Sequence, residues 1–590
     1  MIRSPWKGTR VAGTGSPRWQ WLPADTATAA LLGLILLWPN PHLPGLRPPN
    51  ELSRVYATRA LVDDHTLSID GPMKRQGGIT DFAEREGRRY SDKAPGLSLL
   101  AAPIYGLLRL IWSPGQLSNR TLILLFRWIL IVGPSLGFIA LLAPWLRSIG
   151  IRSPIARATQ VAYGLGTPAF AYAMKFVGHQ AAAWMIGLAL MAAWAARGGR
   201  RSFPAAAGLL SGMAAITEYP AAPMVGVLAA LVGLRSRRPG ADLMAFGLGA
   251  LGPLTVLAAY HTVAFGAPWL TGYHFIKNPS FSGHHVGGIA GVGWPRRDAL
   301  IGVLFSSHRG LLVVAPWLVF SLGGLFALRR RDLRPLVIVL ALHGLLHLWV
   351  ATGFGYWLGG WSVGPRHLVA ALPSFAVLAG LGWDRFRGTS LAAVAAGWAL
   401  ASCLIGLGVA TTYPGFPEDV LHPLRDLTWP MLARGQFSHS VGSGLGLPPA
   451  WGMGLVFFLA VPLAAVVMAR ALESRGKRTR WGSGIVGWVA VLTLAAVLWS
   501  GPPPTDQARF RVAWLTQRMW SPAHPSPAFD PRLAHWEKSW RRLARGRGRP
   551  EDVERMGAMA AHQGRHLEAL GHYARARWWR RSQTAPPPTQ

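Results

Sequence analysis

Acidic residues and a few basic ones, among them Lys93, gather in a polar stretch between two apolar segments near the start of the chain. The stretch runs from Pro49 to Leu99, and its sequence SDKAPG, which includes Asp92 and Lys93, leads back into an apolar run. Because proline is tolerated in the first turn of a helix, Pro95 predicts a helix start at a membrane surface. The free N–H groups of such a start, together with Lys93, suit a phosphate.

Two carboxylates of this stretch are candidates for a general base. Glu51 follows Asn50 just after the first apolar run, and a partly desolvated carboxylate at a lipid boundary suits proton abstraction. Glu51 also suits a plain helix start, since Asn50 is a fair N-cap and an acidic residue favours the first turn. Asp81, with Asp92 and Lys93, is the reserve candidate, although an exposed loop with a snorkelling lysine explains these three residues as well.

Further charged residues stand at the edges of apolar runs, where an unpaired charge is costly. Glu218, in the sequence TEYP, is either paired with an arginine or part of a site. Arg309 and Arg366 each open an apolar run beside a Gly-rich polar loop. They are either anchors that snorkel to the interface or a clamp for a phosphate.

Histidines in the polar loops raise the question of a metal. His274, His284, His285 and His308 could bind one, but no pair of them shows ligand spacing on a helix, so we interpret them as sugar or headgroup contacts. We predict no metal site and no cofactor, and leave a divalent metal open. The sequence has no P-loop, no H-E-x-x-H and no G-x-S-x-G elbow, which argues against a nucleotide-dependent cytoplasmic enzyme.

The composition sets the fold class. The chain has 590 residues, of which 51% are hydrophobic and 14% charged, and its apolar runs reach the roughly 20 residues that a membrane span needs. We predict an all-α, polytopic membrane helix bundle with about 13 spans, among them runs near residues 96–112, 335–352, 389–410, 450–471 and 482–500. The net charge of +35 fits arginine clusters in cytoplasmic connectors rather than a nucleic-acid partner.

The apolar pattern also predicts the organisation along the chain. Residues 1–20 form a basic cytoplasmic N-terminus. Residues 21–410 form a membrane module whose long loop 41–95 lies outside the cytoplasm. Residues 411–500 hold an amphipathic loop and the last spans. Residues 501–590 form a basic tail that resembles half of a tetratricopeptide repeat, and a single amphipathic helix pair explains this tail equally well.

Several blocks, in order, resemble the type C integral-membrane glycosyltransferases that use polyprenyl-phosphate sugars. The branch with the protein O-mannosyltransferases and the lipid A aminoarabinose transferase is the most similar, over roughly residues 20–410. The blocks are Asn50-Glu51, ATRALVDDHTLSID, GRRYSDKAPGLSLLAAPIY, TEYPAAP, FSSHRGLLVVAPW and LGGWSVGPRHLVAALP.

The resemblance implies an inverting hexosyl or pentosyl transfer on the non-cytoplasmic face of a bacterial inner membrane. A carboxylate of the first outer loop deprotonates a lipid, glycan or protein acceptor, which attacks the anomeric carbon of the polyprenyl-phosphate sugar. By this resemblance Glu51 is the base and Lys93, in a motif like Lys-Pro-Pro, contacts the phosphate. The chain departs from the family pattern at Asn50, often Asp in relatives, and at Ala94, so Asp81 and Asp92 stay open as bases.

Two other functions use the same residues. A transporter or flippase for a polyprenyl-linked lipid needs the basic residues but no base, and it should have charges in both halves of the bilayer. A membrane scaffold would depend on its C-terminal tail. The acidic cluster lies towards one face, which favours the transferase.

Overall fold

The structure is a computed structural model. It describes residues 21–40, 48–198, 200–277, 288, 291–472, 502–506 and 549–562, with scattered positions between 489 and 580. The chain divides into two compact units, a main unit of residues 1–42 and 47–503 and a second unit of residues 43–46 and 504–590. The second unit contains α26 (Pro550–His562). The predicted last span, near residues 482–500, and most of the predicted half repeat lie outside the described residues. The predicted domain boundaries stay predictions.

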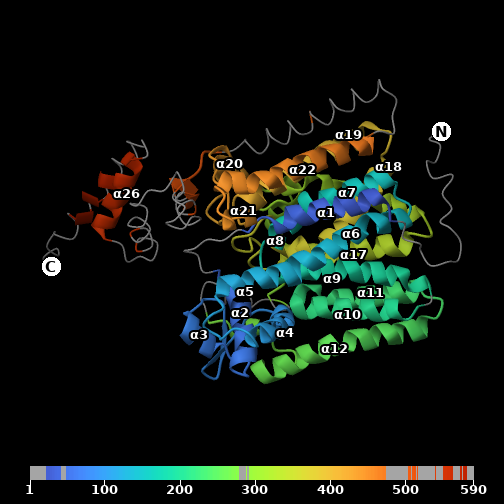
Figure 1. The fold of residues 1–590 in the computed structure, drawn as a ribbon, viewed down its shortest axis with the longest axis horizontal. Coiled ribbons are helices and arrows are strands. Elements are labelled where there is room, and N and C mark those ends of the chain that lie inside the picture. The colour runs from blue at the N-terminus through green and yellow to red at the C-terminus, as the bar shows by residue number, and fades with distance from the viewer. Residues whose placement is uncertain are drawn as a thin grey trace, which may run out of the picture. The chain divides into compact units, whose positions relative to one another are not determined.

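The main unit is almost entirely helical (Figure 1). Its helices in the described residues are α1 (Pro23–Leu37), α2 (Pro49–Asp63), α3 (Asp70–Gln76), α4 (Gly96–Arg109), α5 (Asn119–Phe126), η1 (Arg127–Val132), α6 (Gly133–Ser148), α7 (Ser153–Leu165), α8 (Pro168–Ala173), α9 (Gly178–Ala195), η2 (Ala196–Gly198), α10 (Ser202–Thr217), η3 (Tyr219–Ala221), α11 (Pro223–Arg235), α12 (Pro239–Phe265), η4 (Gly272–Phe275), α14 (Arg297–Phe305), α15 (Leu311–Val314), η6 (Pro316–Phe320), α16 (Ser321–Gly324), η7 (Leu325–Arg329), α17 (Arg334–Gly353), η8 (Arg366–Ala371), α18 (Leu372–Arg385), α19 (Ser390–Thr411), η9 (Leu424–Thr428), α20 (Trp429–Ala433), α21 (Val441–Gly444) and α22 (Pro449–Leu472).

Among the described residues, six helical segments are long and apolar enough to cross a membrane. They are Asn119–Ser148, Pro239–Phe265, Arg334–Gly353, Arg366–Arg385, Ser390–Thr411 and Pro449–Leu472. Shorter apolar helices, such as α1, α10 and α11, accompany them. The predicted polytopic all-α bundle is confirmed, and the chain is a multi-pass integral membrane protein.

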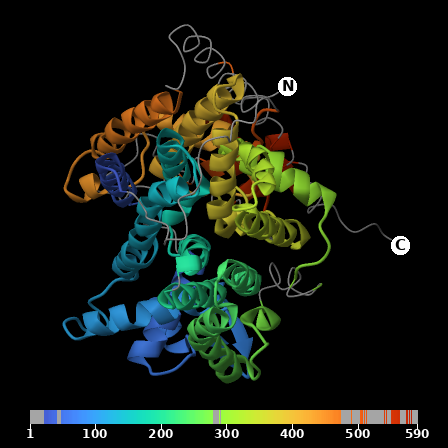
Figure 2. The ribbon, with the colours of Figure 1, turned by 90° about the vertical axis from the view of Figure 1, so that its right-hand side faces the viewer.

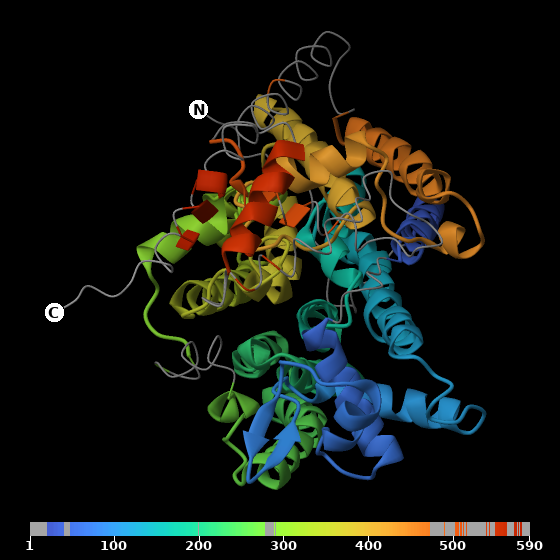
Figure 3. The same ribbon diagram turned by 90° about the vertical axis from the view of Figure 1, so that its left-hand side faces the viewer.

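Arginine-rich connectors lie together at one end of the main unit. Arg147, at the end of α6, forms an ion pair with Asp25 at the start of α1. Arg235, at the end of α11, places its guanidinium carbon 3.6 Å from the ring centroid of Trp194, near the end of α9. Arg152 precedes α7 and donates its backbone N–H to the carboxylate near the end of α18. Figure 2 looks onto this end, and Figure 3 onto the opposite one.

Helix α4, predicted as a span, does not cross the bundle. On its last turns the Tyr105 hydroxyl and the Arg109 guanidinium both donate to the Asp63 carboxylate of α2, at 2.8 and 2.7 Å. Arg59 of α2 in turn donates to Asn119, the first residue of α5. Helices α2 and α4 and the start of α5 therefore all lie at one end of the main unit. The long helices that follow α5 run back and forth between the two ends. The arginine-rich connectors between them then all lie at the other end.

A small hairpin stands beside α2 and the end of α12 (Figure 3). Strands β1 (Ala83–Arg85) and β2 (Arg88–Tyr90) pair antiparallel, with Ala83 opposite Tyr90. Glu86 and Gly87 both have positive φ, 52° and 74°, as the tight hairpin turn with the right twist requires. Ala83 also bridges Ile276 after η4. The hairpin thereby fixes the loop with Asp81 on one side and the turn with Asp92 and Lys93 on the other.

Candidate active site

Charged side chains from six connectors gather at the end of the main unit opposite the arginine-rich connectors. They come from the start of α2, the two segments that flank the hairpin, the turn before α9, the turn between α10 and η3, and the loop before η8. Each of these segments lies at or next to a helix end, so the fold brings the polar groups together at one end of the bundle. The residues are Glu51, Arg54, Asp81, Asp92, Lys93, Lys175, His179, Glu218 and Arg366.

Lys93 lies between two carboxylates. Its Nζ is 2.8 Å from Asp81 Oδ2 and 2.9 Å from Asp92 Oδ2. Burial by itself would lower the pKa of Lys93, but the charges of Asp92 and Asp81 outweigh burial and raise it. The helix start predicted near Pro95 is confirmed, because α4 begins at Gly96. A phosphate at Lys93 would compete with both carboxylates, and its predicted role as a phosphate contact stays a prediction.

The two carboxylates beside Lys93 titrate differently. Burial raises the pKa of Asp92, and the charge of Lys93 only partly opposes this. At Asp81 burial acts in the same sense, but Lys93, and then Arg366, lower the pKa below its usual value. Asp92 also accepts a weak hydrogen bond of 3.4 Å from Ser53 of α2. Of the two carboxyl groups, Asp81 is therefore the more readily ionised.

Glu51 lies in the first turn of α2, which begins at Pro49. Its Oε2 accepts a hydrogen bond of 2.9 Å from the backbone N–H of Phe176, in the turn before α9. Glu51 is therefore both a residue of a helix start and a member of the charged cluster. The neighbouring Asn50 is hydrogen-bonded to Arg54, whose guanidinium donates to the Asn50 backbone oxygen at 3.0 Å.

Among the described residues, Glu218 pairs with a histidine and not with an arginine. The carboxylate Oε2 is 3.2 Å from His179 Nδ1, on the first turn of α9. Burial would raise the pKa of Glu218, but His179, Arg54 and Arg366 together hold it below the usual value. Gly178 makes the approach possible, since a Cβ there would lie 2.6 Å from Glu218 Oε2. Glu218 therefore belongs to the charged cluster as an ionised carboxylate.

Arg309 and Arg366 occupy different environments. Arg309 is fully buried and donates to four backbone oxygens, those of His308, Leu358, Gly360 and Phe416. Arg366 is half-buried and, within the described part of the chain, donates a single long hydrogen bond of 3.5 Å to His367 Nε2. Arg309 thus holds the 358–360 loop in place, whereas the Arg366 guanidinium keeps donors for a ligand.

His308 lies behind Arg309 and away from solvent. Its Nε2 is 3.3 Å from the backbone oxygen of Pro417, and burial lowers its pKa to about 4. It therefore stays neutral at neutral pH. His284 and His285 lie outside the described residues. Nowhere in the described ranges do three His, Cys, Asp or Glu side chains come close enough to hold a metal ion. The predicted roles of Arg309, Arg366 and His308 stay predictions.

Sequence reasoning missed four members or neighbours of the cluster. Arg54 is buried, and the carboxylates of Glu218, Asp92 and Glu51 all act on its charge. Lys175, His179 and Tyr273 are the others. Lys175 stands within the apolar run AFAYAMKFV, and the rule that flagged Glu218, a charge inside an apolar run, could have found it.

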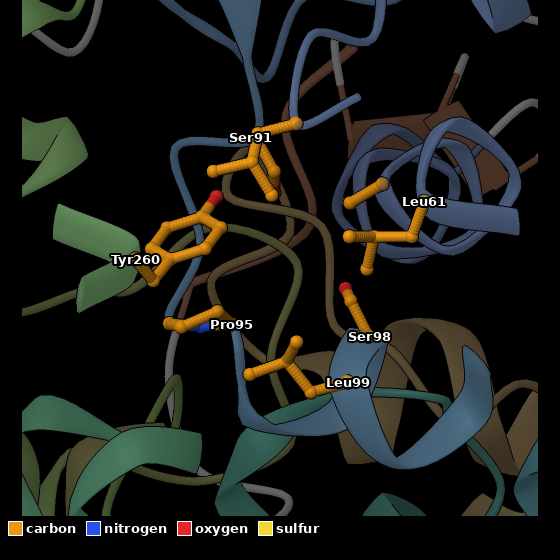
Figure 4. A pocket seen from close by; sticks show the side chains of 8 residues that line it. Leu61, Ser91, Pro95, Ser98, Leu99 and Tyr260 are labelled. Carbon is orange, nitrogen blue, oxygen red and sulfur yellow. The ribbon is translucent and has the colours of Figure 1, made fainter. Parts of the chain in front are cut away.

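A narrow apolar crevice lies next to this site (Figure 4). Ala57 and Leu61 of α2, Leu99 of α4 and Tyr260 of α12 line it, and Ser91 stands at its edge. It is too tight to hold a water molecule. The crevice therefore packs α2, α4 and α12 together and leaves the charged cluster as the candidate site.

Comparisons with known proteins give structural but no sequence matches. No family model and no curated protein matches the chain. ArnT from Cupriavidus metallidurans, solved bound to undecaprenyl phosphate, is similar with a TM-score of 0.43 and 15% identity, over 84% of this chain and 77% of that chain. The archaeal oligosaccharyltransferase AglB from Archaeoglobus fulgidus, in complex with an inhibitory peptide and a dolichol-phosphate, is similar with a TM-score of 0.36 and 12% identity. That match covers 86% of this chain and 60% of AglB.

Proposed function

We propose that the chain transfers a sugar from a polyprenyl-phosphate donor to a hydroxyl or amine acceptor. The observation that carries this proposal is the gathering of carboxylates and cations at one end of an apolar helix bundle. A lipid phosphate needs cations at the depth of the membrane surface. An acceptor hydroxyl needs a carboxylate close to the same point. The cluster of Glu51, Lys175, Glu218 and Arg366 supplies both.

In the proposed reaction, Glu51 takes the proton of the acceptor hydroxyl. The acceptor oxygen forms a bond to the anomeric carbon, and the bond from that carbon to the phosphate oxygen breaks. The electron pair of the broken bond goes to the phosphate, which leaves as the free polyprenyl phosphate. Attack opposite to the leaving group inverts the anomeric carbon. Asp81 is the reserve base.

The remaining predicted residues receive roles around these atoms. Lys93, held by Asp81 and Asp92, and Arg366 are proposed to contact the phosphate. Glu218 and His308 are proposed to line the sugar and acceptor side, and Arg309 to position the loop that carries Gly360. The transferred sugar is a hexose or a pentose, and the acceptor is a lipid, a glycan or a protein.

The proposed reaction takes place on the non-cytoplasmic face of a bacterial inner membrane. Positive connectors are retained in the cytoplasm. The arginine-rich connectors that include Arg147 and Arg235 lie at the end opposite to the cluster. This arrangement supports an acceptor and a lipid-linked sugar that meet outside the cytoplasm.

The test follows the leaving group. Purified protein in lipid vesicles is given a set of polyprenyl-phosphate sugars, radiolabelled in the lipid, with a membrane extract as acceptor. We expect release of free polyprenyl phosphate with at least one donor, and no release from boiled protein. Binding of the labelled lipids without release under any donor would overturn the transferase and favour a lipid carrier.

A further inference from the structure

We propose that Lys175 binds the phosphate of the lipid-linked substrate jointly with Arg366, as a phosphate contact additional to Lys93. This inference rests on the proposed function and names a further binding residue of the same site. The ligand chemistry is a phosphate ester anion. A lipid headgroup and free phosphate share this chemistry, and the experiment below separates them.

Lys175 has donors to spare. Its Nζ donates a long hydrogen bond of 3.3 Å to the backbone oxygen of Trp361, and the ammonium lies over the ring of Tyr172, 5.5 Å from its centroid. No carboxylate of the described residues lies within ion-pair distance of it. An ammonium group carries three donors, so the half-buried Lys175 can give two more to a ligand.

The loop before η8 brings Arg366 to the same place. Trp361, which accepts from Lys175, follows Gly359 and Gly360, and a Cβ at Gly359 would lie 2.9 Å from Arg366 Cδ. The positive charge of Arg366 also lowers the pKa of Lys175, as expected for two cations close together. One loop thus holds two cations close together, and in the described ranges no carboxylate is bound directly to either, so both can donate to an anion.

Lys93 lies in the opposite environment. Two carboxylates of the protein already contact its ammonium, so its donors are engaged. Lys175, in contrast, is followed by Phe176, whose backbone N–H contacts the base candidate Glu51. A phosphate between Lys175 and Arg366 would therefore place its sugar within reach of Glu51.

The protonation of Lys175 gives this proposal a distinctive signature. Burial lowers the pKa of Lys175 to about 8, Glu51 opposes the shift, and Arg309 and Arg366 add to it. The charged and titratable groups that act on Lys175 or contact it are Glu51 on α2, Tyr172 on α8, Arg309 in the loop between α14 and α15, and Arg366 on η8. Arg127 on η1 donates to the backbone oxygen of the neighbouring Met174. A bound anion favours the charged ammonium, so phosphate binding near pH 8 should draw a proton onto Lys175.

The experiment measures binding of polyprenyl phosphate to the full chain by calorimetry at pH 8, in two buffers of different ionisation enthalpy. For the wild type we expect uptake of about half a proton per lipid bound. Lys175→Met should raise the Kd by about tenfold or more, as loss of a charged hydrogen bond does. Lys175→Arg should keep the affinity but take up no proton. Lys74→Met, an exposed lysine of α3, should behave as wild type.

The outcomes separate the inference from the proposed function. Equal affinity and equal proton uptake in wild type and Lys175→Met would overturn the role of Lys175. Wild type that binds polyprenol as well as polyprenyl phosphate would overturn it too. If inorganic phosphate competes at the same concentration as the lipid, the site of Lys175 and Arg366 binds free phosphate and not the lipid headgroup. This result would also count against the proposed role of Lys175. If the wild type binds the lipid and Lys175→Met binds it more weakly, yet no sugar donor is ever turned over, the phosphate-binding role of Lys175 is supported and the proposed transferase function is wrong.

Discussion

The carboxylate of Glu51 accepts a hydrogen bond of 2.9 Å from the backbone N–H of Phe176, which lies 125 positions further along the chain. This contact joins the first turn of α2 to the turn before α9. Lys175 precedes Phe176 in that turn, and Gly178 and His179 follow it. The single hydrogen bond therefore fixes the position of the base candidate Glu51 relative to Lys175 on one side and His179 on the other. The geometry of the whole cluster depends on this junction.

Replacing Glu51 by Gln should abolish transfer and spare binding. The amide keeps the shape and can still accept from Phe176, but it cannot take a proton, and loss of a general base typically costs about 10²- to 10⁴-fold in rate. Release of polyprenyl phosphate measures the reaction, and Glu86→Gln, in the exposed hairpin turn, is the matched control. Full activity of Glu51→Gln would move the base to another carboxylate, with Asp81→Asn as the next variant.

Removal of the Lys93 ammonium should destabilise the protein. Lys93→Met leaves the buried carboxylates of Asp81 and Asp92 facing each other without their cation, and breaking such a buried pair costs about 3–5 kcal/mol. Thermal unfolding in detergent measures the loss. The double variant Lys93→Met, Asp81→Asn should recover part of it, because one of the two uncompensated charges is gone. Unfolding temperatures unchanged from wild type would contradict the ion-pair network.

A methyl group at residue 178 should disturb the junction of α9 and α10. The Cβ of Gly178→Ala would lie 2.5 Å from the Thr217 backbone oxygen and 2.6 Å from Glu218 Oε2, and overpacking of this kind costs about 1–3 kcal/mol. Gly137→Ala on α6 is the control, since nothing lies within 4 Å of its Cβ position. We expect a lower unfolding temperature for the first variant and an unchanged or slightly higher one for the second. The reverse order would refute the close contact.

Glu218 should contribute stability that is lost in acid. Its folded pKa lies below the ordinary value of 4.5 because His179, Arg54 and Arg366 overcome the effect of burial. A carboxyl with a lowered folded pKa stabilises the protein above its unfolded pKa, and this contribution disappears as the pH falls through the folded pKa. Unfolding temperatures from pH 7 down to about pH 3.5 should therefore fall more steeply for wild type than for Glu218→Gln. Parallel curves would contradict the prediction.

The two ends of the main unit should lie on opposite sides of the membrane. Glu86 in the hairpin and Arg200 between α9 and α10 are exposed and lie at opposite ends. The native Cys403 is buried, so an introduced cysteine is labelled without background. In intact cells a membrane-impermeant thiol reagent should label Glu86→Cys and leave Arg200→Cys unlabelled. Labelling of Arg200→Cys alone would invert the topology and place the site in the cytoplasm.

The sequence by itself determined the apolar helices, because a run of about 20 apolar residues has few alternatives to a membrane helix. The predicted boundaries near 335–352, 389–410 and 450–471 agree with α17, α19 and α22 to within a residue or two. It also identified the stretch around Glu51 and Lys93, since charges between apolar runs stand out in composition. It predicted residues 96–112 as a span, because apolar character alone could not reveal that Arg109 and Tyr105 hold α4 against α2.

Only the tertiary structure decided which charges meet. Glu51 and Phe176, Glu218 and His179, and Lys175 and Trp361 come from connectors that no spacing rule relates, because the packing of separate helices sets their distances. The same packing decided that the Arg309 guanidinium donates to backbone oxygens, whereas the Arg366 guanidinium keeps N–H donors for a ligand. Residue type places both arginines at the edge of a span. Their partners depend on how the loop with Gly359 and Gly360 folds against the bundle.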